Sequence, residues 1–320
     1  MSILGIDIGG TEIKAGRVDA DGRVLSARSV KTPASLGALE TALHYIVASG
    51  EPPEGIGIGC KGVINPETTR VEVLPGTLHY LEGQCLADLV LPAVGAGIPV
   101  YADNDARVAL VGEMAWGAAR GRTDVVMLTL GTGVGGGVVS GGRLLRGKTG
   151  VAGHLGHINV NPDGALCICG SHGCLETVFS AQAIEAEAFA AARRGCESLL
   201  TDWFQAKPQR LSCQAVFEAA AGGDALARSI LARGIRALGA AIAGLAHAFD
   251  PEIVILGGQM TAAGAALFDP LRAEVAVRTR VMLQREIPIV PQQVEDRSGI
   301  VGAAALVLGR GMECVFGREA

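Results

Sequence analysis

One arrangement of strands and glycine turns occurs twice in the chain, and it limits the folds that the chain can adopt. The first copy starts at Ile3 and the second at Val125. In each copy an apolar, strand-like run ends in a glycine-rich turn, and two further strand-like runs follow on either side of a tight turn of the hairpin kind. A repeat over such a long period predicts two related halves that face each other.

Strand-like and helix-like segments alternate through the rest of the chain. We expect strands at 55–59, 98–102 and 252–256, and helices at 36–49, 106–116, 181–194, 224–249 and 299–308. This alternation predicts the α/β class. No proline-rich, serine-rich or low-complexity linker separates the halves, so we place the domain boundary within 112–121. The N-terminal α/β domain is then 1–115, and the C-terminal α/β domain is 116–320.

Composition argues against several classes of function. Hydrophobic residues make up 49% of the 320 residues and charged residues 18%, so a large core can form without disulfides. The aromatic content of 4% argues against a stacking platform for nucleic acid, and the net charge of -5 argues against a phosphate-backbone partner. The N-terminus has no basic lead or cleavage site, and no uncharged apolar run is long enough to cross a membrane. We therefore expect a cytoplasmic protein with no nucleic-acid or membrane partner.

The two glycine turns are candidate phosphate sites. Gly131, Gly133 and Gly136 match G-x-G-x-x-G, but a strand and a turn follow where a dinucleotide site needs a helix, so we exclude that site. Backbone N–H groups of glycine-rich turns hold anionic oxygens, and two such turns on facing halves suit a nucleoside triphosphate held across a cleft. The alternative is that both glycine turns only connect the strands of a hairpin and bind no phosphate. The residues concerned are Gly9, Gly10 and Thr11 in the first glycine turn, and Gly131, Thr132 and Gly133 in the second.

Polar residues stand beside these turns. Asp7 precedes the first glycine turn, where a carboxylate usually binds magnesium directly or through water. Asp103, Asn104 and Asp105 follow a strand and precede a helix, and one of them is expected to cap that helix. Polar residues at the carboxyl end of a strand also suit a binding site. Asn104 could bind a hydroxyl group, and Asp105 could take the proton of an attacking alcohol.

A cluster of cysteine and histidine residues predicts a structural metal site. Its members have the type and spacing that a tetrahedral zinc ion takes, and a closed shell of four ligands is typical of structural zinc. They are His157, Cys167, Cys169 and Cys174. Gly170 and Gly173 allow the turns between them. His172 is a competing ligand, which we rank below His157.

Taken together, these motifs resemble the ROK family (repressors, open reading frames and sugar kinases) almost from end to end. The segments that carry the resemblance are DIGGT from Asp7, GIGCKGVI from Gly57, DNDA from Asp103, LGTGVGGG from Leu130, GHLGH from Gly153, CICGSHGCLE from Cys167 and DPEIVILGG from Asp250. The resemblance implies an actin-like (ribonuclease H-like) fold, in which two α/β domains enclose a central cleft. The last helix, at about 299–310, is expected to pack back on the N-terminal domain.

The resemblance also implies roles for single residues. ATP, with Mg²⁺, is the phosphate donor, the 6-hydroxyl of a sugar is the acceptor, and Asp105 is the catalytic base. Gly257 and Gly258 lie near the adenosine. The implied sugar contacts are Gly62, Asn104, Asp105, His154, His157 and Glu176, and His157 is also a zinc ligand. A homodimer is implied as well.

Two residues depart from the family pattern. Lys61 stands where proline is common, and His154 stands where the family has a glutamate. A carboxylate can accept hydrogen bonds from two sugar hydroxyls, whereas a neutral imidazole offers one donor and one acceptor, so this sugar contact should differ. Histidine here resembles some bacterial N-acylmannosamine kinases, while the cysteine segment resembles glucokinases.

We therefore expect an ATP-dependent hexose kinase, with glucose ahead of N-acetylmannosamine and N-acetylglucosamine. Polyphosphate is left open as an alternative donor. The rival from another class is a non-catalytic, sugar-binding ROK regulator. ROK repressors carry a DNA-binding helix-turn-helix before the first phosphate loop, and Asp7 stands too early in the chain for one. Regulators also often lose the catalytic aspartate, which this chain retains as Asp105.

Overall fold

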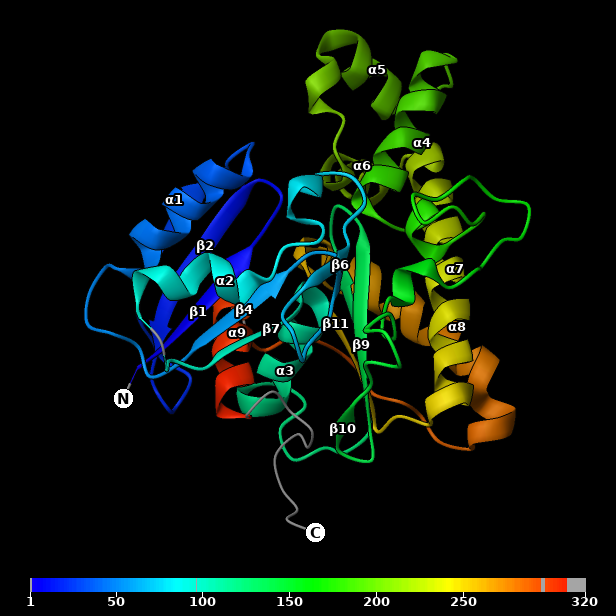
Figure 1. Ribbon diagram of the computed structural model, residues 1–320. Coiled ribbons are helices and arrows are strands. Elements are labelled where there is room, and N and C mark those ends of the chain that lie inside the picture. Colours follow the sequence, from blue (N-terminus) through cyan, green and yellow to red (C-terminus); the bar gives the residue numbers. More distant parts are fainter. Residues whose placement is uncertain (1, 96, 295–296, 310–320) are drawn as a thin grey trace. The chain divides into compact units, whose positions relative to one another are not determined.

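The computed structural model describes residues 2–95, 97–294 and 297–309, which form two compact units. The first unit contains the described residues of 1–125, 137–153 and 292–320, and the second contains 126–136 and 154–291. Figure 1 shows the helices and strands that make up each unit. The domain boundary expected near 115 stays a prediction.

The first sheet contains the first copy of the repeated arrangement. Strands β1 (Ile3–Ile8), β2 (Glu12–Val18) and β3 (Val24–Lys31) form an antiparallel meander. Strands β4 (Ile56–Cys60) and β7 (Val100–Asn104) extend the sheet in parallel from β1, and the full order is β3-β2-β1-β4-β7. The strands that follow the first glycine turn were predicted correctly.

Helices cover both faces of the first sheet. Leu4 and Ile6 of β1 share one hydrophobic core with residues of helices α1 (Leu36–Val47) and α2 (Leu86–Val90). Helices α3 (Asp105–Trp116) and α9 (Ser298–Leu308) pack together, and α9 lies against β1 and β4. The approach of α9 is very close, because a Cβ at Gly5 would lie 2.0 Å from the Ile300 carbonyl oxygen.

The second sheet contains the second copy. Its strands are β8 (Val125–Leu130), β9 (Val134–Ser140), β10 (Arg143–Leu144), β11 (Ile253–Gly257) and β12 (Ile289–Pro291). Their order is β10-β9-β8-β11-β12, which repeats the order of the first sheet: a three-strand run along the chain and two later strands beside its first strand. The two related halves predicted from the sequence are therefore present as two sheets of the same topology.

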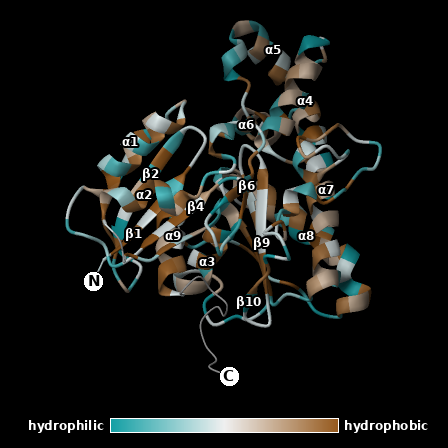
Figure 2. Cartoon of the chain, in the orientation of Figure 1, coloured by the Kyte–Doolittle hydropathy of each residue, from teal (hydrophilic) through white to brown (hydrophobic). Residues whose placement is uncertain are grey.

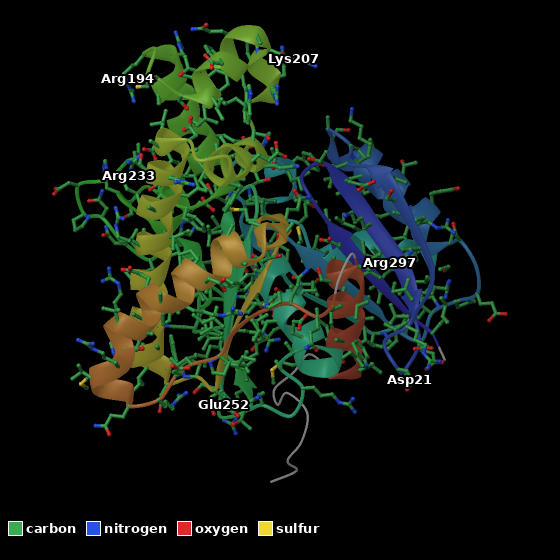
Figure 3. All side chains as sticks on the ribbon, turned by 180° about the vertical axis from the view of Figure 1, so that it is seen from behind. Asp21, Arg194, Lys207, Arg233, Glu252 and Arg297 are labelled. Atoms are coloured by element: carbon green, nitrogen blue, oxygen red, sulfur yellow. The ribbon has the colours of Figure 1, made fainter. Side chains whose placement is uncertain are left out.

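The helices of the second unit are α4 (Ala181–Arg193), α5 (Leu199–Ala206), α6 (Cys213–Ala221), α7 (Ala225–Phe249) and α8 (Ala265–Leu283). Helices α4 and α7 were predicted to within one residue at each end, whereas α5, α6 and α8 were not predicted. Helix α7 packs against α4, α6 and α8. The α7 side chain Arg233, labelled in Figure 3, pairs with Glu187 of α4.

Among the described residues, α7 alone has the length and apolar composition to cross a membrane. Of its most apolar stretch, 61% is buried in the fold. Apolar and polar positions alternate along it in Figure 2, and packing of the apolar positions accounts for its composition.

The remaining elements are short. Strands β5 (Val63–Ile64) and β6 (Val71–Val73) form a two-stranded sheet. The single-turn helices are η1 (His79–Leu81), η2 (Leu91–Ala93), η3 (Leu155–His157), η4 (Leu175–Thr177), η5 (Pro208–Arg210) and η6 (Gln259–Ala263).

Candidate active site

Three parallel strands of the first unit end at one edge of the sheet. Ile8 of β1 lies beside Cys60 of β4, and Cys60 lies beside Asn104 of β7. The chain therefore leaves the sheet at the same edge three times, through the first glycine turn, through Gly62 and through Asp105. In α/β folds this edge is where ligands bind.

The first glycine turn is held by backbone and side-chain hydrogen bonds. The N–H of Gly9 donates to the Glu12 carbonyl over 3.1 Å, and a Cβ at Gly9 would lie 2.8 Å from the same oxygen. The Thr32 hydroxyl donates to the Gly9 carbonyl over 2.7 Å, and its N–H donates to the Thr11 carbonyl over 3.0 Å. Thr32 was not predicted from the sequence, because only the pairing of β2 with β3 brings it to this turn.

Asn104 caps α3 and also holds the loop after β4. Its side-chain oxygen accepts from the N–H groups of Ala106 and Arg107, so the expected cap is confirmed. Its Nδ2 donates to the Gly62 carbonyl over 3.0 Å. Gly62 has φ +96°, and a Cβ there would lie 2.5 Å from the Val73 carbonyl oxygen. Asn104 is 7% exposed, so its main observed role is to tie this loop to α3.

Asp105 is the first residue of α3, and its side chain is exposed. One carboxylate oxygen accepts from the N–H of Ala106 over 2.9 Å. An exposed carboxylate at the carboxyl end of β7 has the access that a base for a sugar hydroxyl requires.

Asp7, the last residue but one of β1, lies at the same sheet edge and is partly buried. The pKa of Asp7 is raised from its ordinary 3.8 to about 6, because burial and, to a smaller extent, the negative charge of Asp105 together outweigh the lowering effect of Lys14 on the neighbouring strand. A Cβ at Gly299, in the first turn of α9, would lie 2.3 Å from the Asp7 carboxylate. A carboxylate whose ionised form is disfavoured in this way suits a position beside a cation or its water shell.

Replacing Asp7 with asparagine is expected to stabilise the protein at neutral pH. The folded-state pKa is raised, so the contribution of Asp7 to stability is complete below pH 3.8 and is lost as the pH rises through about 6. Asp7→Asn should therefore raise the free energy of unfolding by about 1–3 kcal/mol at pH 7.5 and change it little at pH 3.5. Denaturant unfolding in magnesium-free buffer, without a chelator that would also remove zinc, measures both values.

The control for this prediction is Asp21→Asn, in the exposed turn between β2 and β3 (Figure 3). It should show no difference between the two pH values. Equal effects of Asp7→Asn at both pH values would contradict the prediction.

In the second unit, Glu176 and α4 hold the second glycine turn. The N–H of Gly131 donates to the Gly133 carbonyl over 3.0 Å, and the N–H of Ala181, at the start of α4, donates to the Gly131 carbonyl over 2.8 Å. Oε2 of Glu176 accepts from the N–H of Val134 over 2.9 Å. A Cβ at Gly133 would lie 2.4 Å from the same carboxylate oxygen, so glycine is required there.

The turn after β11 lies beside the second glycine turn. Gly257 ends β11, and Gly258 follows it with φ +86°. A Cβ at Gly258 would lie 2.4 Å from the carbonyl oxygen of Leu130, the last residue of β8. The structure thus brings Gly258 close to the end of β8, from which the second glycine turn starts, and the expected place of Gly257 and Gly258 near the adenosine stays a prediction.

The four expected zinc ligands lie together in the second unit. Their ligand atoms are all within 4.8 Å of one another; Cys167 Sγ is 3.5 Å from His157 Nδ1, and Cys169 Sγ is 3.6 Å from Cys174 Sγ. A tetrahedral zinc ion with its usual bond lengths separates its ligand atoms by about 3.3–3.8 Å, so the cluster fits that ion. His172 instead places its Nδ1 3.1 Å from the Gly164 carbonyl oxygen.

Sugar-binding candidates flank this cluster. The His154 and His157 rings are nearly parallel, with centroids 6.4 Å apart and an angle of 8° between the planes. Glu176 follows Cys174 by two residues and lies in η4. His154 and Glu176 are therefore close neighbours of cluster residues in the chain, and Glu176 also contacts Val134 at the end of the second glycine turn.

Comparison with known proteins agrees with these motifs. The model of the ROK family matches residues 3–310. The chain belongs to the ROK family. The α/β, actin-like fold expected for a ROK protein is confirmed.

Among ROK relatives, the chain is 36% identical to a glucokinase of Thermotoga maritima, over 97% of this chain and 98% of that protein. It is 33% identical to an N-acetylmannosamine kinase of Shigella flexneri, over 97% of this chain and 99% of that protein. Among solved ROK structures, a Streptomyces griseus glucokinase in complex with glucose and AMPPNP is similar with a TM-score of 0.82 and 35% identity. That similarity covers 96% of this chain and 99% of the glucokinase.

Proposed function

We propose that this ROK protein transfers the γ-phosphoryl group of ATP to the 6-hydroxyl of a hexose, and that glucose is the preferred acceptor. The observation that carries the proposal is the exposed Asp105 carboxylate, which α3 holds at the same sheet edge as Asp7 and the first glycine turn. The similarity of this chain to glucokinases, which extends over nearly its whole length, supports the same reaction.

The proposed chemistry is a single displacement. Asp105 takes the proton of the sugar 6-hydroxyl while that oxygen forms a bond to the γ-phosphorus. The bond between the γ-phosphorus and the bridging oxygen breaks, and ADP leaves. N–H groups of the two glycine turns are proposed to bind the phosphate oxygens. Asp7 would hold Mg²⁺ directly or through water, and the ion would neutralise charge on the phosphates. Gly257 and Gly258 are proposed to lie against the adenosine.

Sugar binding is assigned to residues of both units. We propose Gly62, Asn104 and Asp105 in the first unit, and His154, His157 and Glu176 in the second. A structural Zn²⁺ bound by His157, Cys167, Cys169 and Cys174 would fix the loop that carries the histidine and glutamate contacts. Asn104 would contribute to sugar binding in part by holding the Gly62 loop, because its amide donates a hydrogen bond to the Gly62 carbonyl.

A coupled assay of ADP release tests the proposal. The panel contains glucose, mannose, N-acetylmannosamine and N-acetylglucosamine, each with ATP or polyphosphate as donor and with a sugar-free control. We expect sugar-dependent ADP release with the highest kcat/KM for glucose. Sugar binding without ADP release from any member would instead support the non-catalytic regulator.

N-acetylmannosamine is the second candidate acceptor, and His154 is the observation that favours it. Its imidazole lies beside the zinc ligand His157 and offers a sugar one donor and one acceptor. We expect His154→Glu to shift the ratio of kcat/KM values towards glucose over N-acetylmannosamine by about tenfold. A ratio unchanged by this substitution would remove His154 from the residues that select the sugar.

Three further expectations stay predictions. They are the homodimer, the cytoplasmic location, and the absence of nucleic-acid and membrane partners.

A further inference from the structure

Three charged side chains cluster at the junction of β7 and α3. The side chains of Asp103 and Arg107 are almost completely buried, and that of Arg146 is 15% exposed. Nε of Arg107 donates to one carboxylate oxygen of Asp103 over 2.6 Å, and Nε of Arg146 donates to the other over 2.8 Å. The N–H of Asn104 also donates to Asp103, over 2.8 Å. Asp103 is therefore held by both arginines and by the backbone of its neighbour.

Arg107 also holds a second, distant segment. Its Nη1 donates to the carbonyl oxygens of Gly150 and Ala152, each over 2.7 Å. A Cβ at Gly150 would lie 2.7 Å from the Ile64 carbonyl oxygen, so this segment packs directly on β5. The chain then passes from the first unit to the second at His154. The Arg107 guanidinium thus holds the segment 150–152, which immediately precedes the proposed sugar contact His154 in the chain.

Stability alone does not account for this cluster. Removing charged side chains from water costs more than ion pairing usually returns, and apolar side chains of similar volume often give an equally stable core. A guanidinium adds geometry instead, because its five donors lie in one plane at fixed angles and hold several acceptors at set distances. Here the acceptors come from a strand end and from a segment remote in sequence.

We propose that Arg107 is a positioning residue, which holds the base Asp105 and the segment leading to His154 as one rigid piece. The inference rests on the proposed phosphoryl transfer. Arg107 and Asp105 share the first turns of α3, and Asp103 is joined directly to the capping residue Asn104. Loss of the Arg107 guanidinium therefore loosens the junction of β7 and α3 next to Asp105. It also removes the hydrogen bonds to the carbonyls of Gly150 and Ala152. A misplacement of about 1 Å can lower the rate about 100-fold.

Two variants test this role. Arg107→Lys keeps a positive charge opposite Asp103, but a single nitrogen cannot reproduce the planar contacts with the carboxylate and both carbonyls. Arg146→Gln removes the second partner of Asp103 at a less buried position and is expected to fold. We expect Arg107→Lys to lower kcat about 10- to 100-fold, with the KM for ATP within about twofold of wild type. Arg146→Gln should lower kcat by a smaller factor.

A second measurement does not depend on activity. Hydrogen exchange of the backbone N–H groups in 149–153, measured without substrates, is expected to become faster in Arg107→Lys. Exchange in the other strands and helices of the first unit should change less, because the lost contacts are local.

Glu113→Gln, on the same helix, is the matched control. Glu113 is completely buried, and one carboxylate oxygen accepts from the N–H groups of Gln293 and Val294 over 3.0 and 2.7 Å. The other accepts from the N–H of Ala118 over 2.7 Å. The variant removes a buried charge at the far end of α3 and replaces one of its two acceptor oxygens with an NH2 group, which cannot accept a hydrogen bond. It should lower Tm at least as much as Arg107→Lys, yet keep kcat within about twofold of wild type.

The outcomes distinguish a failure of the positioning role of Arg107 from a failure of the proposed function. If kcat falls in proportion to Tm in both Arg107→Lys and Glu113→Gln, or if exchange in 149–153 is unchanged, the positioning role is wrong. A wild-type protein that releases no ADP with any sugar overturns the proposed function. An active wild type with a fully active Arg107→Lys variant overturns the positioning role alone.

Discussion

Asp105→Asn is expected to lower sugar-dependent ADP release by about 10²- to 10⁴-fold, the usual contribution of a general base. Asparagine has nearly the same shape and can still accept the hydrogen bond from the N–H of Ala106. It cannot take the proton of the sugar hydroxyl. Because Asp105 is exposed, the free energy of unfolding should change by less than about 0.5 kcal/mol. Calorimetric titration should show sugar affinity within about threefold of wild type.

Asp88→Asn is the matched control for the base. Asp88 is also an exposed carboxylate in the first turn of a helix of the first unit, in α2. Its variant should keep wild-type kcat. Near-normal turnover of Asp105→Asn would show that another group takes the proton, and Asp7 would then be the next carboxylate to test at this sheet edge.

Loss of zinc is expected to have the largest effect on stability. Protein purified without chelator should carry about one zinc ion per chain, as metal analysis can show. Cys174→Ser should lose the ion and lower the free energy of unfolding by more than about 4 kcal/mol, because metal binding organises the loop. Glu176 lies two residues beyond Cys174 and holds the N–H of Val134, so the KM values for sugar and ATP should rise together.

Cys213→Ser separates the loss of zinc from the cost of replacing a buried thiol. Cys213 lies in α6 of the same unit, is 8% exposed, and is not a member of the four-ligand cluster. Its variant should keep the metal content and both KM values of wild type. A metal-free wild-type protein that unfolds at the same denaturant concentration as a zinc-loaded one would contradict the prediction.

Local patterns in the sequence were enough to predict much of the fold. The run at 125–130 is apolar except for Thr129, is rich in β-branched residues and is followed by Gly131, and the structure places β8 at those residues. Asp250 and Pro251 predicted the end of α7, where Asp250 adopts a left-handed conformation with φ +43°. The zinc candidates were also predictable, because cysteine and histidine ligands close together in sequence need only a tight loop to meet.

Contacts between distant segments could not be predicted in this way. The three polar residues after β7 suggested a cap and a base, but nothing nearby in sequence indicated that Asp103 is buried between Arg107 and Arg146. The contacts of Thr32 with the first glycine turn and of Glu176 with Val134 also depend on tertiary structure. Sequence patterns report which face of an element is buried, and they do not name the partner that covers it.

The close contact of α9 with the first sheet has a consequence for biosynthesis. Cβ atoms at Gly5 and Gly57 would lie 2.0 and 1.7 Å from carbonyl oxygens of α9, so helix backbone rather than side chains covers this part of β1 and β4. A ribosome makes β1, β4 and Asp105 long before it makes α9. Until α9 emerges, the part of β1 and β4 that α9 covers is exposed, and we expect a growing chain to gain kinase activity only after α9 has been made. The second unit can fold earlier, although the first begins to emerge first.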